Sequence, residues 1–264
     1  MASRSAVGSS VGNTALRLSN SVVAWWWTGT ARPCDRCART PSTHRHPLTS
    51  CRPRTARNDV TMSSKLKSLL HKIKRRTWMK YALRGVGGND NFERLDLAYS
   101  IKDPWNMDSP GEAARFEATN RIIEREFGTL DSLLELGCGE GHQTLHFARL
   151  ARQVYGLDVS EKAIERARER VPGGKFAATD IFSQPWLSGD AKVDLVTACE
   201  VLYYLSDVEA TLKRMSEIGR HCLVTIFAPA ARRVGPHLDR IPGLRKDWIW
   251  HGGTVWLVCW WRNE

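Results

Sequence analysis

The sequence predicts a doubly wound α/β domain, in which helices cover both faces of a mostly parallel sheet. From about residue 100 onward, short runs rich in β-branched residues alternate with segments of helical periodicity. A glycine-rich loop follows the first of these runs, and an acidic residue ends the second. Repeated strand–helix units of this length imply parallel strands, because each crossover helix packs back on the sheet.

Residues 1–61 differ in composition from the rest of the chain. They hold nine Arg, no Lys and two Asp, with little apolar periodicity. Such a segment buries too little apolar surface to offset chain entropy, so we expect a disordered tail. Three interpretations stay open: a targeting peptide, an interaction tail, or translated sequence ahead of a true start at Met62. The absence of Lys beside nine Arg favours the third.

The tail also carries Cys34-x2-Cys37, with His44, His46 and Cys51 downstream. This spacing fits no common zinc module, and the flanking sequence predicts no strand or helix that would hold a site. We therefore expect no metal.

The formal net charge of +11 is unevenly distributed. Residues 1–61 carry +7, residues 62–100 carry +6, and residues 101–264 carry −2. The main domain is mildly acidic, so we expect no nucleic-acid partner. No apolar run reaches the roughly 18–20 residues of a membrane span. Cys138, Cys199, Cys222 and Cys259 lie within or at the ends of strand-like runs, which is typical of buried thiols in a reducing compartment and indicates a cytoplasmic protein.

Residues 62–108 are expected to form a basic helical lid. Within residues 65–81, Leu66, Leu69, Leu70 and Ile73 share one helical face, and Lys and Arg occupy much of the remainder. Such a helix can lie on a membrane surface or bind an anionic substrate. The pattern favours the simpler role of a lid or entry helix with a solvated charged face.

The main domain, residues 109–264, begins with a clearly marked helix. Ser109 is a good N-cap, Pro110 suits the first helical turn, and Glu112 completes a capping box. Gly128 then ends the helix.

Strands and helices alternate after it. Strands are expected at residues 132–138, 153–159, 175–181, 193–201 and 221–227, with helices near 142–150, 160–171 and 207–219. Two last runs, residues 248–250 and 254–261, flank His251-Gly252-Gly253. This spacing predicts a hairpin whose final strand is antiparallel to the others.

The most specific motif is residues 133–142, Leu-Leu-Glu-Leu-Gly-Cys-Gly-Glu-Gly-His, a strand that runs into a glycine loop at a helix start. Glycines let a ligand approach the backbone closely, and the helix N-terminus offers free N–H groups. Asp158 ends the next strand, 21 residues after Gly137, where a carboxylate can accept both ribose hydroxyls of a nucleoside. A dinucleotide site would have a third glycine where His142 stands, which argues against NAD(P). Glu135 suits a ligand with an ammonium group, and adenosine with an amino-acid tail describes S-adenosylmethionine.

These motifs, with Asp180-Ile181 and residues 193–205, resemble those of class I S-adenosylmethionine-dependent methyltransferases. More narrowly, Asp103-Pro-Trp105, residues 139–142 and 199–205, and the Trp-rich ending at 255–261 resemble the nodulation protein S family. The resemblance covers roughly residues 92–262. It implies a seven-stranded sheet of order 3-2-1-4-5-7-6 with strand 7 antiparallel, and an S-adenosylmethionine-binding enzyme that methylates a small molecule. An amine acceptor, such as a deacetylated amino sugar, is favoured.

The resemblance also implies individual roles. The glycine loop would hold the methionine part of the cofactor, Glu135 its amino group and Asp158 the ribose. Val159 would pack on the adenine, Asp180 with Ile181 would contact its edge, and Glu200 would lie near the methyl group. The cofactor-binding residues are then Glu135, Gly137, Cys138, Gly139, Gly141, Asp158, Val159, Asp180, Ile181 and Glu200. An acid, His or Tyr can take the acceptor's proton or stabilise the growing cation, so the catalytic candidates are Glu200, Tyr204 and His142. Tyr99, Trp105 and Tyr203 would close over the cofactor or the acceptor.

Three other activities stay open: an O-methyltransferase, a protein or RNA methyltransferase and, less favoured, an NAD(P)-dependent oxidoreductase. The Asn/Asp-Pro-Pro-aromatic motif of nucleic-acid amino-methyltransferases is absent, since residues 198–201 read Ala-Cys-Glu-Val.

Overall fold

The structure is a computed structural model that describes residues 58–263. The tail and zinc-like pattern considered above lie outside these residues, apart from the last few residues of the tail. Among the described helices, none combines the length and the apolar character that crossing a bilayer requires.

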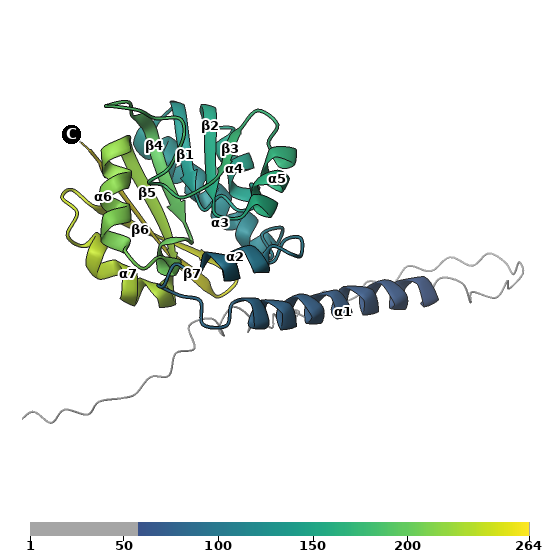
Figure 1. Ribbon diagram of the computed structural model, residues 1–264. Coiled ribbons are helices and arrows are strands. Elements are labelled where there is room, and N and C mark those ends of the chain that lie inside the picture. The colour runs from purple at the N-terminus through teal and green to yellow at the C-terminus, as the bar shows by residue number, and fades with distance from the viewer. Residues whose placement is uncertain (1–57, 264) are drawn as a thin grey trace, which may run out of the picture.

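A seven-stranded sheet forms the centre of the fold (Figure 1). Its strands are β1 Leu130–Leu136, β2 Ala151–Asp158, β3 Lys175–Ala178, β4 Val193–Cys199, β5 Gly219–Phe227, β6 Arg245–His251 and β7 Thr254–Arg262. Their order is β3-β2-β1-β4-β5-β7-β6, and β7 runs antiparallel to both of its neighbours. The predicted topology, including the hairpin, is confirmed.

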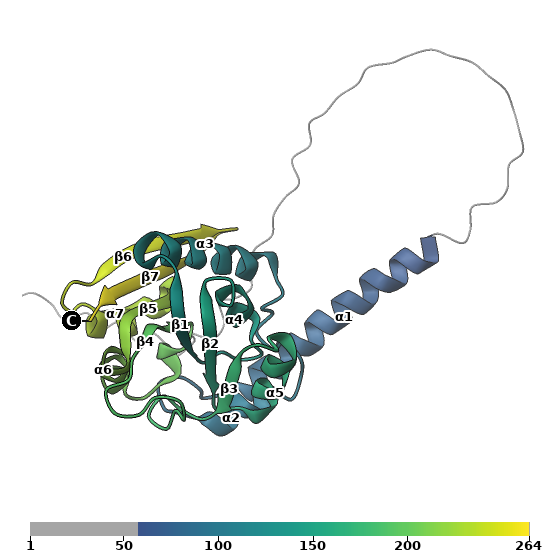
Figure 2. The ribbon, with the colours of Figure 1, turned by 90° about the horizontal axis from the view of Figure 1, so that it is seen from above.

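Two layers of helices cover the sheet (Figure 2). One face packs against α3 Pro110–Phe127, α4 His142–Phe147 and α5 Glu161–Arg170, and the other against α6 Val208–Ile218 and α7 Ala231–Leu238. Neighbouring residues of β1 point to opposite faces of the sheet. Leu133 belongs to the apolar cluster that contains Ile123 of α3, and Leu134 belongs to the cluster that contains Met215 of α6. Both faces are buried, as a parallel sheet requires.

Helix α3 begins and ends where the sequence predicts, but the capping box is incomplete: the Glu112 carboxylate pairs with Arg115, and the Ser109 N–H donates to the Asn106 carbonyl instead. The Ser109 hydroxyl accepts a hydrogen bond from the backbone N–H of Glu112 at 3.3 Å. Gly128 follows the last turn with a φ of 71°, a conformation that glycine adopts without strain.

β1, β2, β3 and β4 all end one to three residues earlier than predicted, and the reason is clear for β3 and β4. β3 stops at Ala178 rather than at residue 181, because the Asp180 carboxylate accepts the backbone N–H groups of Phe182 and Ser183, both at 2.9 Å, and thereby forms a turn. β4 stops at Cys199 rather than at residue 201, because Glu200 has a φ of 62°. Both departures lie where the chain leaves the sheet toward its ligand-binding edge.

The helix 142–150 is also shorter than predicted, since α4 ends at Phe147. Two helices were missed altogether. α2, Phe92–Ala98, is short and is capped by the Asn91 side chain, and α7 contains Gly235 and Pro236, which disguise its helical periodicity.

The basic helix is longer than the 65–81 segment predicted. α1 spans Asn58–Ala82, so it begins before Met62. It projects from the domain and meets it only through its C-terminal turns (Figures 1 and 2). Ala82 and Leu83 are buried there with Val86 and Ala98.

Tryptophans of the C-terminal hairpin fall into two groups, buried and exposed. Trp256, Trp260 and Trp261 are buried, whereas Trp248 and Trp250 are exposed. Trp261 is 2% exposed, and its Nε1–H donates to Ser216 of α6 at 3.0 Å.

We predict that Trp261→Ala lowers the free energy of unfolding by about 3–5 kcal/mol, because it leaves a large cavity between β7 and α6. Urea denaturation followed by circular dichroism measures the change. Trp250→Ala is the matched control: that side chain is 72% exposed, so we expect a change within about 0.5 kcal/mol. Equal losses for the two variants would contradict this assignment of the core.

Candidate functional site

A cavity of about 370 Å³ opens at the carboxyl ends of the strands, beneath the segment that joins α1 to α3. In open α/β sheets, ligands bind at this edge, and the volume suits a small molecule. The cavity wall contains nearly all of the residues singled out from the sequence: Tyr99, Trp105, Glu135, Gly137, Cys138, Gly139, His142, Asp158, Val159, Asp180, Ile181, Glu200, Tyr203 and Tyr204. The exception is Gly141.

Each glycine of the loop has a distinct structural reason. Gly137 and Gly139 have φ values of 64° and 53°. A Cβ at Gly137 would overlap the Val201 side chain, and one at Gly139 would lie 2.7 Å from the Tyr99 hydroxyl oxygen. Gly141 instead lets α4 pack against α5, since its Cβ would lie 3.1 Å from Ala167 Cα. The sequence analysis placed Gly141 at the ligand, whereas the structure gives it a packing position.

Asp158 lies at the end of β2 with its carboxylate directed toward the glycine loop. One carboxylate oxygen accepts the N–H of Gly139 and the other accepts the N–H of Ser160, both at 3.0 Å. Burial raises the pKa of Asp158 to about 6, against these hydrogen bonds and one from Tyr99. These donors fix the orientation of the Asp158 carboxylate at the cavity wall.

Glu135 is 2% exposed and lies at the end of β1. The Thr144 hydroxyl of α4 donates to its carboxylate at 2.5 Å. Burial raises the pKa of Glu135 to about 8, against that hydrogen bond and the charge of Arg115. A cationic ligand group would compensate this buried carboxylate.

Glu200 follows β4 and turns back toward β5. Its carboxylate accepts the Thr225 hydroxyl at 3.1 Å, the Phe227 N–H at 3.0 Å and the Tyr203 hydroxyl at 3.1 Å. Burial raises the pKa of Glu200 to about 7, although Arg115 opposes that shift. The carboxylate is therefore held by three donors at the cavity wall.

Arg115 of α3 is the main site residue that the sequence analysis missed. It is 1% exposed, and its Nε donates to Glu112 at 2.8 Å. Its Nη1 donates to Gln143 of α4 at 2.8 Å and to the Thr225 hydroxyl of β5 at 3.2 Å. The Thr225 hydroxyl in turn donates a hydrogen bond to the Glu200 carboxylate, so Arg115 and Glu200 are linked through Thr225. The only sequence signal was the spacing of Glu112 and Arg115, which is also common on solvated helices.

Four aromatic side chains from two distant segments meet at the cavity. Trp105 Nε1–H donates to the Tyr204 hydroxyl at 3.2 Å. The ring centroids of Tyr99 and Trp105 are 4.8 Å apart, and those of Tyr203 and Tyr204 are 4.7 Å apart. Tyr99 and Trp105 come from the segment that joins α1 to α3, and Tyr203 and Tyr204 come from the 3₁₀ turn Leu202–Tyr204; that they close over a ligand stays a prediction.

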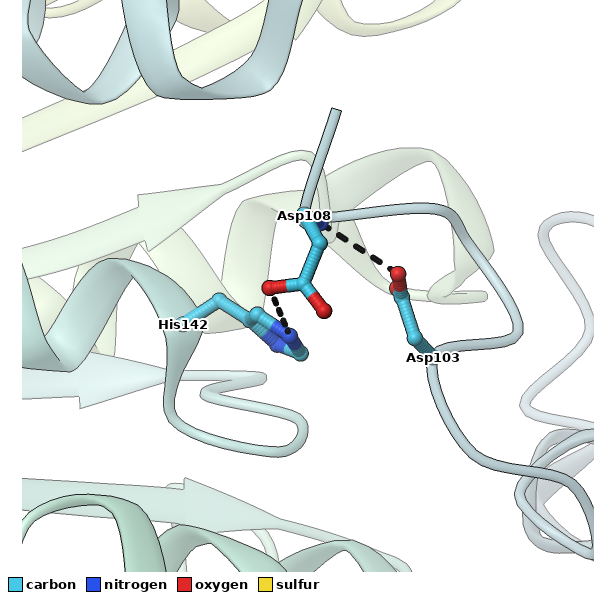
Figure 3. Close-up of side chains that lie close together, drawn as sticks. All are labelled: Asp103, Asp108 and His142. Atoms are coloured by element: carbon cyan, nitrogen blue, oxygen red, sulfur yellow. Dashed lines mark hydrogen bonds and ion pairs between the residues drawn. The ribbon is translucent and has the colours of Figure 1, made fainter. Parts of the chain in front are cut away.

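His142 is the first residue of α4 and faces the lid segment, residues 83–109, which joins α1 to α3 (Figure 3). Its Nε2 lies 3.3 Å from the Asp108 carboxylate. Burial and the charge of Arg170 lower the pKa of His142, while Asp103 and Asp108 among its acidic neighbours oppose that shift. The imidazole is therefore largely neutral at physiological pH and is able to accept a proton.

Asp103, Asp108 and His142 form a cluster that could hold a metal ion, since their carboxylate and imidazole atoms lie within 4.8 Å of one another. In the described part of the chain it is the one cluster of this kind. Asp103 already accepts the backbone N–H groups of Met107 at 2.5 Å and Asp108 at 3.3 Å. The Asp103 carboxylate thus stabilises the turn at residues 103–108. This role explains why the three side chains lie together without a metal ion.

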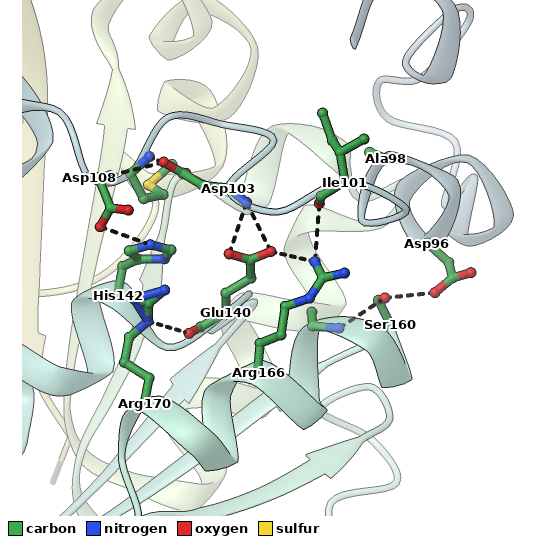
Figure 4. Close-up of polar contacts among 12 residues, drawn as sticks. Asp96, Ala98, Ile101, Asp103, Asp108, Glu140, His142, Ser160, Arg166 and Arg170 are labelled. Carbon is green, nitrogen blue, oxygen red and sulfur yellow. Dashed lines mark hydrogen bonds and ion pairs between the residues drawn. The ribbon is translucent and has the colours of Figure 1, made fainter. Parts of the chain in front are cut away.

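Glu140 fastens the lid segment to the domain (Figure 4). Its carboxylate accepts the Asp103 N–H at 3.0 and 3.1 Å and pairs with Arg166 of α5 at 2.5 Å. Arg166 also donates to the Ile101 carbonyl at 3.1 Å. Asp96 of α2 adds contacts with Ser160 and Lys162. The segment that covers the cavity is therefore held by one ion pair to α5, Asp96–Lys162, and by hydrogen bonds to Glu140, Ser160 and Arg166.

Residues 134–221 match the family described as "Methyltransferase domain". Nodulation protein S of Rhizobium tropici is 27% identical over 143 residues, which cover 52% of this chain and 60% of that protein. Nodulation protein S of Bradyrhizobium diazoefficiens is 33% identical over 128 residues, covering 46% and 57%. The chain thus spans roughly 60% of the length of these relatives.

Among solved structures, the N-methyltransferase NodS from Bradyrhizobium japonicum in complex with S-adenosyl-L-homocysteine aligns with a TM-score of 0.56 and 24% identity. The alignment covers 66% of this chain and 99% of that one. At this identity the likeness establishes the fold. Residues 134–221 therefore match a methyltransferase domain, and the chain is similar in sequence to nodulation protein S and in fold to NodS, as the sequence motifs implied.

We predict that Arg115→Leu lowers the free energy of unfolding by about 3–5 kcal/mol, because it leaves Glu112 and Glu200 buried without their cation. Its loss also raises the pKa of Glu200 above its value of about 7 in the unmodified protein, so above pH 7 the native variant retains a proton that the unmodified native protein has released. The deficit should therefore be nearly constant below about pH 6 and grow as the pH rises through about 7. Chemical denaturation at several pH values measures both effects.

Arg149→Leu is the matched control, since that Arg forms an exposed ion pair with Glu117. We expect a loss below about 1 kcal/mol there. A pH-independent deficit in Arg115→Leu would show that the guanidinium acts only through packing.

Proposed function

We propose that this protein transfers a methyl group from S-adenosylmethionine to the nitrogen of a small amine, such as a deacetylated amino sugar. The observation that carries the proposal is the convergence of Glu135, the glycine loop and Asp158 on one cavity of a methyltransferase domain. A buried acid for an ammonium group and an oriented acid for ribose hydroxyls match the two ends of that cofactor.

The loop fits the cofactor sterically as well. Gly137 and Gly139 line the cavity in a positive-φ conformation, and a Cβ at either would collide with Val201 or Tyr99, so glycine is required for this shape of the loop. Asp158 would bind the ribose, Val159 would pack on the adenine, and Asp180 with Ile181 would contact its edge. Cys138 would contribute its backbone to the loop, with its thiol buried.

The charge of the cavity favours an amine over a hydroxyl acceptor. Its wall holds eight carboxyl groups and a single guanidinium, that of Arg115. The carboxyl groups belong to Asp90, Asp103, Glu135, Glu140, Asp158, Asp180, Glu200 and Asp207. Such a wall attracts an acceptor that arrives as an ammonium ion. The acceptor of the related N-methyltransferase suggests the same chemistry.

When bound, the cofactor supplies a methyl group carried by a sulfonium sulfur, and the neutral thioether is a good leaving group. The protein's contribution is then alignment and proton transfer. The acceptor must lose a proton before its nitrogen attacks, and His142 of the cavity wall would take that proton, with Asp108 beside the resulting imidazolium; the lowered pKa of His142 and its 3.3 Å contact with Asp108 support this role.

Glu200 and Tyr204 are proposed to stabilise the cation that forms on nitrogen. Glu200 brings negative charge to the wall, and the Tyr204 oxygen is oriented by Trp105. The aromatic faces of Tyr99, Trp105 and Tyr203 would exclude water and attract the cation.

We predict that S-adenosylhomocysteine binding at about pH 7 releases close to one proton, because its ammonium group lowers the pKa of Glu135 from about 8. The affinity should rise with pH, by up to about tenfold per unit, until Glu135 is ionised without ligand. Calorimetry in phosphate and Tris buffers, which differ in ionisation enthalpy, counts the protons.

5′-Methylthioadenosine is the matched control ligand, since it retains the adenosine and lacks the amino-acid group. Its binding should release far less than one proton, and Glu135→Gln should abolish the release seen with S-adenosylhomocysteine. Equal proton counts for the two ligands would place the ammonium group away from Glu135.

The proposed reaction is tested by transfer of tritiated methyl groups to glucosamine, partly deacetylated chitooligosaccharides and simple amines. We expect label on the amines and none on N-acetylglucosamine, whose nitrogen is blocked. Asp158→Ala should lower transfer and S-adenosylhomocysteine binding by about 10–100-fold, since a hydrogen bond to a charged group is worth about 1.5–3 kcal/mol.

Asp190→Ala, at an exposed position of a loop, is the matched control and should behave as the unmodified protein. Label on a hydroxyl or only on RNA or protein would refute the amine acceptor. Failure to bind S-adenosylhomocysteine, with Asp158→Ala indistinguishable from the unmodified protein, would refute the proposed cofactor.

A further inference from the structure

Helix α1 carries an apolar stripe that the fold leaves uncovered. Leu66, Leu69, Leu70 and Ile73 are 53–58% exposed, and they recur at the i, i+3, i+4, i+7 spacing of a single helical face. A contiguous exposed aliphatic surface of this kind marks an interaction site.

The opposite face of α1, at its C-terminal turns, packs against the domain. Arg75, Trp78, Met79 and Ala82 repeat the same spacing nine residues later. Trp78 Nε1–H donates to the Ala98 carbonyl at 3.3 Å, and Arg75 donates to Asn106. Nine residues are two and a half turns at 3.6 residues per turn, so the stripe points away from the domain.

Positive charge surrounds the stripe. From Val60 to Asn89 the sequence contains eight Lys or Arg and no Asp or Glu. On the helix, the exposed Lys72 and Arg76 border one side of the stripe, and Lys74 borders the other. Their aliphatic stems can lie along a surface while their charges reach anionic groups.

We propose that α1 binds the surface of an anionic lipid bilayer, with the stripe at the boundary between headgroups and acyl chains and the cations on lipid phosphates. A flat surface fits because the domain lies on the other side of the helix. Nucleic acid would satisfy the charges but leave the stripe in water. A second copy of α1 would place like charges side by side, which opposes association.

The test uses the full chain and vesicles of phosphatidylglycerol and phosphatidylcholine in equal parts, with pure phosphatidylcholine vesicles for comparison. In low salt, we expect cosedimentation with the anionic vesicles alone. The double variant Leu69→Glu/Leu70→Glu should lower the partition coefficient by about tenfold or more. Lys72→Glu/Lys74→Glu should lower it too and reduce its dependence on salt.

Matched controls make the same changes elsewhere on the surface. Trp250→Glu alters an exposed apolar residue of β6, and Lys213→Glu/Arg232→Glu alters exposed cations of α6 and α7. These variants should partition as the unmodified protein does. Circular dichroism and S-adenosylhomocysteine binding verify that every variant is folded.

Three results would overturn the proposal. The first is no sedimentation with anionic vesicles, and the second is unchanged partition of Leu69→Glu/Leu70→Glu. The third is self-association of the unmodified protein that the same double variant abolishes without any vesicle binding, since the stripe would then be a contact between copies. Binding to polyuridylate that depends only on the cations would likewise assign the helix to a polyanion.

Discussion

The buried guanidinium of Arg115 is the constraint on which the site depends. A buried cation is tolerated only when acids and hydrogen-bond acceptors surround it, and these come from α3, α4 and β5. The Thr225 hydroxyl links this group to Glu200. The first helix of the domain, the helix after the glycine loop and the end of β4 are thereby held in one arrangement, which is the arrangement that shapes the cavity.

The site also depends on a second set of charges. Glu140 directly follows the glycines that approach the ligand, and it holds the lid segment through Asp103 and Arg166. Glu140 is 4% exposed, so its contacts with Asp103 and Arg166 are largely shielded from water. Two networks of buried charge therefore shape the cavity, one around Arg115 beneath it and one around Glu140 at the segment that covers it.

Much of the fold was predictable because its signals are local. The alternation of strands and helices, the caps of α3 and the hairpin at Gly252-Gly253 all follow from periodicity and turn chemistry. The ends of β3 and β4 were predicted too far along, because Asp180 and Glu200 leave the sheet through side-chain hydrogen bonds and a positive φ that apolar runs do not reveal. α7 was missed because Gly235 and Pro236 interrupt its pattern.

The sequence by itself determined the class of the domain and the identity of its ligand-binding loop, since a glycine loop after a strand and an acid after the next have few other physical explanations. Only the tertiary structure decided what each polar group touches. It moved Gly141 from the ligand to a helix contact, brought Arg115 into the site, and joined His142 to Asp108. It also separated the two faces of α1. These facts depend on burial and on contacts between distant segments, which sequence spacing does not encode.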